Sequence, residues 1–175
     1  TLPMFHCNGW CFPWTVTERA GTHVCLRQPA GELIVNALIK HKVSHLSGAP
    51  IIMQMIADYL ISNNIDLTQE IKMMTAGAPP PEAVLGKMKS CGIDVIHVYG
   101  LTETYGPSVV CAWKTEWNNL SSDEQAKMKA RQGVPYSVQE DIKIVDPKTL
   151  KNVPKDGETI GEVFTRGNIL SLIHI

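Results

Sequence analysis

Residues 94–104 place several chemically capable side chains at one point of the chain. An apolar run ends in Tyr99 and Gly100, and Thr102 and Glu103 follow after Leu101. In open α/β sheets, side chains at strand ends project into a crevice where ligands bind. The tyrosine ring offers a flat face for a base, the glycine permits close backbone approach, the threonine can donate to a phosphate oxygen and the carboxylate can hold Mg²⁺. The combination indicates a site for a nucleotide with a metal-bound phosphate.

A second strand end precedes this one along the chain. Residues 72–75 read as a short strand ending in small residues, and a helix over residues 82–90 starts after three prolines. Parallel strands joined by one helix place both of their following loops at the same edge of the sheet. We therefore expect the loop at Gly77 beside Tyr99. The alternative is that each segment is only a strand, a turn and a capped helix start.

Five sequence blocks resemble the AMP-forming acyl-activating superfamily, which includes acyl-CoA synthetases, 4-coumarate–CoA ligase, luciferases and peptide-synthetase adenylation domains. The two most specific blocks are TAGAP at residues 75–79 and YGLTET at residues 99–104. LPMFH at residues 2–6, HKVSHLSGAP at residues 41–50 and GEVFTRG at residues 161–167 agree in order. The sequences of the blocks are most similar to those of plant-type and related medium-chain or aromatic acyl-CoA synthetases.

The resemblance implies an α/β fold with a parallel or mixed sheet flanked by helices and a smaller β portion, an interior part of the large N-terminal domain of the adenylate-forming fold. We expect the α/β part at residues 1–131 and the smaller β portion at residues 132–168. Residues 169–175 depart from the family pattern, which suggests a truncated or artefactual tail. The family's phosphate loop, ribose-binding aspartate and lysine-bearing domain do not occur in this sequence. We therefore expect the chain alone to be inactive.

The implied activity is that of a carboxylate–CoA ligase. A fatty or aromatic acid reacts with ATP to give an acyl-adenylate and pyrophosphate, and coenzyme A then takes the acyl group. By resemblance, Glu103 binds Mg²⁺ and Thr102 hydrogen-bonds the α-phosphate, which makes them the expected catalytic residues; helix-dipole complementarity is the alternative role for the glutamate. The residues expected to bind the nucleotide are Gly77, Ala78, Pro79, Tyr99, Gly100, Leu101 and Thr102.

Three residues are expected beside the acyl group. The family places a histidine at the position of His6, although a histidine in this context also suits a protein core. Several relatives carry a Gln-Gly pair where this chain has His97-Val98, so strand packing is an alternative role for the imidazole of His97. Gly100 stands where relatives restricted to acetate carry tryptophan. We therefore expect a medium-length, branched or aromatic acid to fit better than acetate.

Composition narrows the function classes. A chain of 175 residues suits one domain, and a net charge of −1 gives no indication of nucleic-acid or anionic-membrane binding. No apolar run reaches the roughly 18 residues of a membrane span. Five cysteines favour reduced thiols in an intracellular protein, cytoplasmic or peroxisomal. The expected partners are a small carboxylic acid, ATP and coenzyme A, and the sequence leaves the oligomeric state open. The other functions that we consider are an adenylation domain that loads a carrier protein and a catalytically silent nucleotide-binding or scaffold module.

Hydrophobic periodicity predicts alternating strands and helices. A helix is expected to start near Asn8 and break near Pro13, and another is expected to be capped by Ser122. Including these two, helices are expected over residues 8–20, 30–41, 50–62, 82–90 and 121–131. Strands are expected over residues 1–5, 23–27, 43–47, 72–75, 94–98, 140–145 and 161–165.

Overall fold

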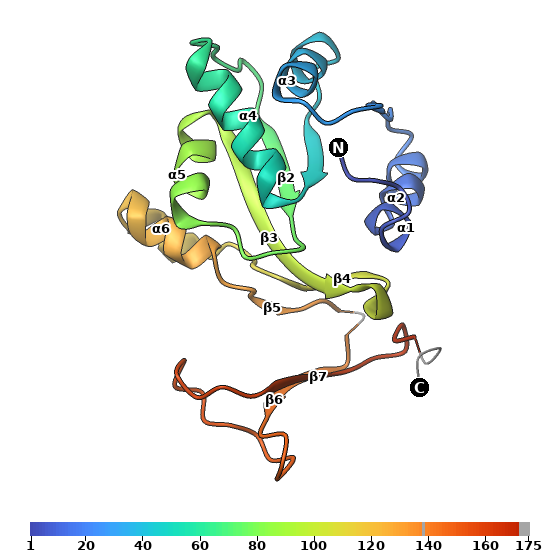
Figure 1. Ribbon diagram of the computed structural model, residues 1–175, viewed down its shortest axis with the longest axis vertical. Helices are drawn as coiled ribbons and strands as arrows, with labels where there is room; N and C mark the ends of the chain where they lie inside the picture. The colour runs from blue at the N-terminus through green and yellow to red at the C-terminus, as the bar shows by residue number, and fades with distance from the viewer. Residues whose placement is uncertain (138, 172–175) are drawn as a thin grey trace.

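The computed structural model describes residues 1–137 and 139–171. Its larger part is a five-stranded mixed sheet in the order β1-β2-β3-β4-β5, with helices packed on it (Figure 1). Strands β1 (His45–Gly48), β2 (Ile71–Thr75) and β3 (Ile93–Leu101) are parallel. Helices α4 (Pro50–Ser62) and α5 (Glu82–Ser90) connect them. The expected α/β architecture is confirmed.

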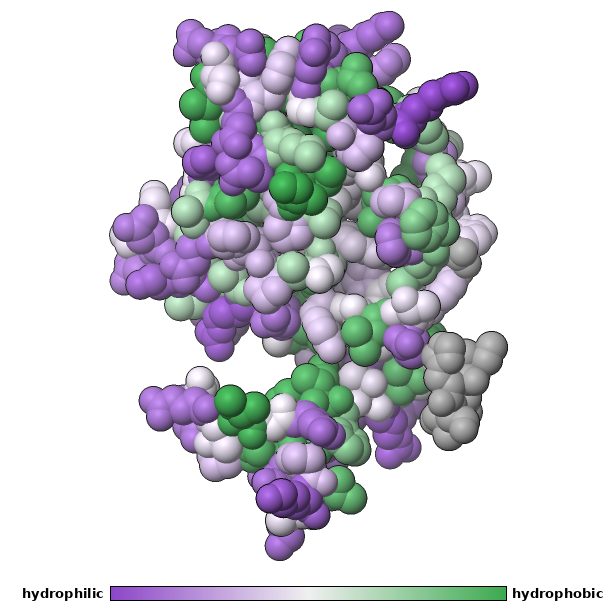
Figure 2. Space-filling view, in the orientation of Figure 1, coloured by the Kyte–Doolittle hydropathy of each residue, from purple (hydrophilic) through white to green (hydrophobic). Residues whose placement is uncertain are grey.

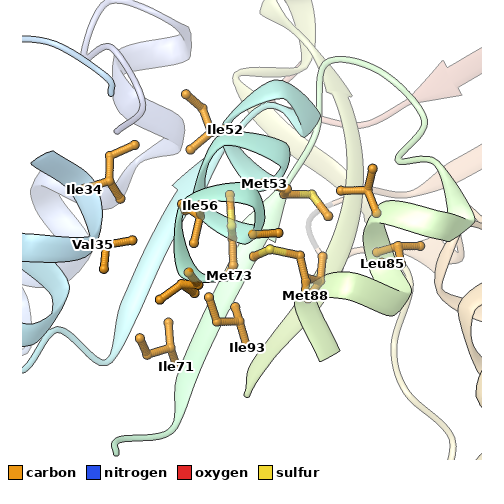
Figure 3. Close-up of a cluster of buried hydrophobic side chains, with 14 of the residues drawn as sticks. Ile34, Val35, Ile52, Met53, Ile56, Ile71, Met73, Leu85, Met88 and Ile93 are labelled. Atoms are coloured by element: carbon orange, nitrogen blue, oxygen red, sulfur yellow. The ribbon is translucent and has the colours of Figure 1, made fainter. Parts of the chain in front are cut away.

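The core lies between these helices and one face of the sheet. Strand β2 alternates, with Ile71 and Met73 buried and Lys72 exposed, as expected for a strand covered on one side. Helix α3 (Gly31–Lys40) packs beside α4. Figure 3 shows aliphatic and methionine side chains from helices α3, α4 and α5 and from strands β2 and β3 meeting in this core. This burial fixes the register of the strands, because a one-residue slip would turn the apolar side chains to the other face.

The second half of the sheet is antiparallel, so the sheet is mixed, one of the two expected kinds, although no strand was expected over residues 106–110 or 134–135. After β3 the chain makes one short turn, η1 (Thr102–Thr104), and returns as β4 (Gly106–Val110). Strand β5 (Val134–Pro135) pairs with β4. The element between β4 and β5 includes the 3₁₀ turn η2 (Thr115–Asn119) and helix α6 (Ser122–Lys129).

The cap of α6 corrects a sequence prediction. Ser121, rather than Ser122, is the N-cap residue. Its hydroxyl oxygen accepts from the backbone N–H of Glu124 at 3.4 Å, and the Glu124 carboxylate accepts from the backbone N–H of Ser121 at 2.9 Å. Such a reciprocal pair needs Glu or Gln three positions after the cap. Ser122 has Gln125 at that spacing, but the amide of Gln125 instead donates to the carbonyl of Leu120 at 2.9 Å.

Two expected strands are wrong. Residues 1–5 form coil and a turn, and residues 23–27 form coil and a bend. A strand needs a neighbour for its backbone hydrogen bonds, and within the described residues neither segment pairs with the free edge of β1. Thr1 reaches that edge only through its hydroxyl, which donates to the carbonyl of Ser47 at 2.6 Å.

The expected helix near the N-terminus is two short elements, α1 (Cys7–Trp10) and α2 (Phe12–Glu18). The break lies at Cys11, whose φ is +65°, and Pro13 occupies the first turn of α2. A proline is tolerated in a first helical turn because the backbone N–H there has no intrahelical partner.

The smaller β portion is a two-stranded antiparallel sheet of β6 (Asp141–Val145) and β7 (Glu162–Arg166), as expected. It lies apart from the main sheet in Figure 1. The division after residue 131 stays a prediction, and β5 follows it while pairing with the main sheet. The expected tail at residues 169–175 lies partly outside the described residues. No helix in the described part of the chain has the length and apolar character needed to cross a bilayer.

Candidate functional site

The end of β2 lies beside the middle of β3. Thr75 of β2 pairs in register with His97 of β3, and β3 continues beyond that pair to residue 101. Gly77 lies in the loop two residues after the end of β2, and Tyr99 lies in β3 two residues after His97. The parallel register confirms that the two loops follow neighbouring strands, and the approach of the Gly77 loop to Tyr99 stays a prediction.

The loop after β2 has backbone open to approach. Gly77 adopts a φ of +89°, a left-handed conformation that glycine takes without steric cost. A Cβ built on it would have no atom within 4 Å. Gly77, Ala78 and Pro79 are all exposed, whereas Thr75 is fully buried. A ligand can therefore reach this backbone without displacing a side chain.

Gly100 is required by the β3–β4 hairpin. The pairing of the two strands shifts register between Tyr99 and Gly100, which is the mark of a β-bulge. A Cβ at residue 100 would lie 2.0 Å from the carbonyl oxygen of Gly106 and 3.0 Å from the Cα of Pro107. Packing of the hairpin therefore requires glycine at residue 100. This requirement is separate from the expected effect of Gly100 on the size of an acyl pocket.

The turn η1 presents Thr102 and Glu103 at the tip of this hairpin. Thr102 is exposed and Glu103 is half-buried, and the backbone carbonyl of Glu103 accepts from the N–H of Ser171 at 2.7 Å. Leu101, another expected nucleotide contact, is exposed beside them. The two side chains expected to meet phosphate and metal are therefore neighbours on one short turn.

Thr104 fixes this turn, a role that sequence reasoning missed. The residue is 1% exposed. Its Oγ1 accepts from the N–H of Leu101 at 2.8 Å and lies 3.0 Å from the carbonyl oxygen of Leu101 and 2.8 Å from that of Gly106, so its proton can be donated to either. The signal was the second threonine of the TET triplet, because a hydroxyl two or three residues into a turn commonly bonds local backbone.

His6 and His97 have different surroundings. His6 is exposed at the start of α1, and its ring centroid lies 4.4 Å from that of Phe5. The next residue, Cys7, reaches the β3 end, with 3.6 Å between its Sγ and the carbonyl oxygen of Leu101. The structure therefore brings the His6 segment to the same hairpin that carries Glu103.

His97 is buried, at 3% exposure, and packs toward the end of α6. Its Nδ1 lies 3.1 Å from the carbonyl oxygen of Ala130 and 3.0 Å from that of Arg131. Because both partners accept, Nδ1 carries the proton. Burial lowers the pKa of His97, only partly opposed by these backbone bonds, so the imidazole is neutral near pH 7. Its role toward substrate stays a prediction.

Glu103 suits one kind of metal site. Within the described residues no group of three or more His, Cys, Asp or Glu side chains could enclose an ion. Mg²⁺ is commonly bound through one or two carboxylates together with substrate phosphates and water. The donor set therefore fits a magnesium ion that arrives with a nucleotide, and does not fit a metal enclosed by protein ligands alone.

A separate hollow of about 410 Å³ lies on the β6–β7 part, between β6 and the 152–159 loop, and none of the expected site residues lines it. Figure 2 shows apolar side chains on this lower part of the molecule. The exposed apolar residues there include Ile144, Ile160, Val163 and Phe164.

The model of the family described as "AMP-binding enzyme" matches residues 1–172. The chain is 48% identical over 171 residues to a peroxisomal acetate/butyrate–CoA ligase of Arabidopsis thaliana, covering 97% of this chain and 30% of that protein. It is 47% identical over 172 residues to a 2-methylpropanoate–CoA ligase of Humulus lupulus, covering 98% of this chain and 31% of that protein. The chain thus spans about a third of the length of the relatives it matches.

Solved structures agree on the fold. A luciferase-like enzyme from the mealworm Zophobas morio superposes with a TM-score of 0.76 at 20% identity, over 95% of this chain and 38% of that one. The O-succinylbenzoate–coenzyme A synthetase of Bacillus subtilis in complex with AMP superposes with a TM-score of 0.73 at 20% identity, over 97% of this chain and 32% of that one. The solved structures show the same fold, and the family model over residues 1–172 shows that this chain belongs to the AMP-binding enzyme family.

Proposed function

We propose that this chain is the part of an AMP-forming carboxylate–CoA ligase that holds the adenine and the metal-bound phosphates of ATP. The observation that carries the proposal is the parallel register of β2 and β3, in which the strand end before the open Gly77 loop pairs two residues before Tyr99. The printed names of several relatives support the reaction, since they are CoA ligases for acetate, butyrate, 2-methylpropanoate and trans-cinnamate.

Each residue has a separate task in this proposal. The backbone of Gly77, Ala78 and Pro79 forms one wall of the adenine site, and Tyr99 offers the opposing face. Thr102 donates to a phosphate oxygen, and Glu103 holds the ion that offsets phosphate charge. A carboxylate and a triphosphate repel each other, so positioning and charge compensation are the main contributions a protein can make.

For the acid substrate we propose only a class, namely a fatty or aromatic carboxylate larger than acetate. Gly100 offers no side chain to close a pocket, and His6 lies in the segment beside the same hairpin. A panel of acetate, butyrate, hexanoate and cinnamate, compared by kcat/KM for acyl-adenylate formation, tests this choice. Acetate giving the highest value would contradict it.

The test of the reaction is pyrophosphate exchange into ATP by the complete natural protein in which this chain occurs. Glu103→Gln keeps the size of the side chain and removes its charge, and we expect a loss of about 100-fold, or roughly 3 kcal/mol of transition-state stabilisation. Glu116→Gln on η2, an exposed residue outside the site, is the matched control and is expected to change nothing.

Two further outcomes are informative. Wild-type protein that binds ATP but shows no exchange with any acid of the panel would favour a silent nucleotide-binding module. We expect the isolated 175-residue chain to show no exchange above background. We further propose an intracellular location, in the peroxisome or the cytoplasm, because three relatives carry "peroxisomal" in their printed names. Fluorescence of the tagged protein distinguishes the two compartments.

A further inference from the structure

Two cysteine thiols contact the two ends of the turn that presents Thr102 and Glu103. Cys7 donates from Sγ to the carbonyl oxygen of Leu101, the residue before the turn, at 3.6 Å. Cys11 donates from Sγ to the carbonyl oxygen of Tyr105, the residue after it, at 3.7 Å. The two thiols are four residues apart, as are the two carbonyls. The segment from Cys7 to Cys11 therefore runs alongside the turn in the same direction.

The backbone that carries these thiols is in an unusual conformation. The φ angles of Cys7, Gly9, Trp10 and Cys11 are all positive, between 44° and 65°. A left-handed conformation costs a non-glycine residue roughly 1–2 kcal/mol. Such strain persists only where surrounding contacts hold it, and it is concentrated at functional sites. The contacts that hold this segment include those with the hairpin, whose Gly106 would place a Cβ 3.6 Å from the Cα of Trp10.

The thiol of Cys11 keeps its proton under ordinary conditions. Burial raises the pKa of Cys11, and the neighbouring Cys7 raises it further. The thiol of Cys11 is thus a donor and not a thiolate at neutral pH. The carbonyl of Leu101 can accept from Cys7 and from Thr104 together, because a carbonyl oxygen has two lone pairs.

We propose that Cys7 and Cys11 are positioning residues, a thiol latch that holds the His6 segment against the turn carrying Glu103. This inference rests on the proposed function of that turn. The latch fixes both ends of η1 and so sets the direction of the Glu103 carboxylate. It also couples the position expected beside the acyl group to the position expected to hold the metal ion.

The test compares the complete natural protein with the double variant Cys7→Ala/Cys11→Ala. We expect kcat/KM for ATP to fall about 4-fold, since a thiol is a weak donor and each of the two bonds then contributes a factor of roughly 2. We expect the Mg²⁺ concentration at half-maximal rate to rise by a similar factor. Replacing both residues with serine keeps a donor at each position and is expected to restore part of the loss.

The matched control is Cys25→Ala, which removes an exposed thiol outside the latch. If the double variant does not fold, the single variants Cys7→Ala and Cys11→Ala replace it. A role in stability alone would lower the melting temperature and leave the Mg²⁺ requirement unchanged, and that result overturns the proposal.

A second measurement does not depend on the reaction. Hydrogen–deuterium exchange should increase at the amides of residues 101–106 in the double variant, and remain unchanged in α4 and β2. Unchanged exchange at the turn overturns the latch even in an active enzyme. Increased exchange at the turn in a protein with no pyrophosphate exchange supports the latch while contradicting the proposed function, so the two failures are distinguishable.

Discussion

Gly100→Ala should disrupt the hairpin that carries the candidate site. The added Cβ would lie 2.0 Å from the carbonyl oxygen of Gly106 and 2.8 Å from its carbonyl carbon. Ordinary carbon–oxygen contacts between strands are about 3.3 Å, so β4 must move by roughly 1.3 Å to accommodate one methyl group. Both obstructing atoms belong to backbone, so no side-chain rotation can relieve the clash.

This displacement has a structural and a functional cost. Overpacking typically costs about 1–3 kcal/mol, and we expect about 3 kcal/mol here because the strand itself must shift. The displaced strand is joined to Glu103 through η1. Misplacing a catalytic group by about 1 Å can reduce the rate roughly 100-fold, so we expect kcat/KM for pyrophosphate exchange to fall by that order.

The assay pairs urea denaturation with pyrophosphate exchange on the complete natural protein. Gly86→Ala is the matched control, because its Cβ would have no atom within 4 Å and the residue lies inside α5. That control should raise the free energy of unfolding by about 0.5–1 kcal/mol, as alanine favours a helix over glycine. The reasoning is refuted if Gly100→Ala stays within twofold of wild-type activity and matches wild-type stability.

Two further predictions concern buried polar groups at the paired strand ends. Burial lowers the pKa of His97 from its ordinary 6.5, so below that pH the unfolded chain takes up a proton that the folded chain does not, and the free energy of unfolding should fall between pH 7 and pH 5. His97→Gln keeps a donor without this titration and should reduce the pH dependence in urea denaturation; equal slopes would contradict the assignment. Thr75 is fully buried, and its hydroxyl has no hydrogen-bond partner within the described residues. Thr75→Val should therefore raise the free energy of unfolding by about 1 kcal/mol, and a decrease would mean that the hydroxyl has a partner.

Local sequence was sufficient for the elements with strong periodicity. The predicted helices at residues 50–62 and 82–90 have the same bounds as α4 and α5. In both, a proline precedes or begins the first turn, and one face carries the apolar side chains. The motif spacing also predicted that β2 and β3 are parallel, because one intervening helix is the connection that parallel neighbours require.

Local sequence failed where an element depends on a distant partner. Residues 1–5 and 23–27 have the composition of strands but do not pair with β1 in the described structure. Strand β4 was missed because its pairing with β3 depends on the tight turn at η1 and the bulge at Gly100. The break before α2 was placed at Pro13, although the left-handed residue is Cys11.

The sequence by itself determined the family, the alternation of strands and helices, and the side chains that can meet a nucleotide, since these depend on residue type and spacing. Only the tertiary structure decided that a hairpin backbone requires Gly100, that His97 bonds the end of α6, and that Cys7 and Cys11 contact both ends of the Glu103 turn. The contacts of His97, Cys7 and Cys11 join residues that are 33 to 94 positions apart in the sequence. Their geometry follows from how strands and helices pack in three dimensions, which no local pattern specifies.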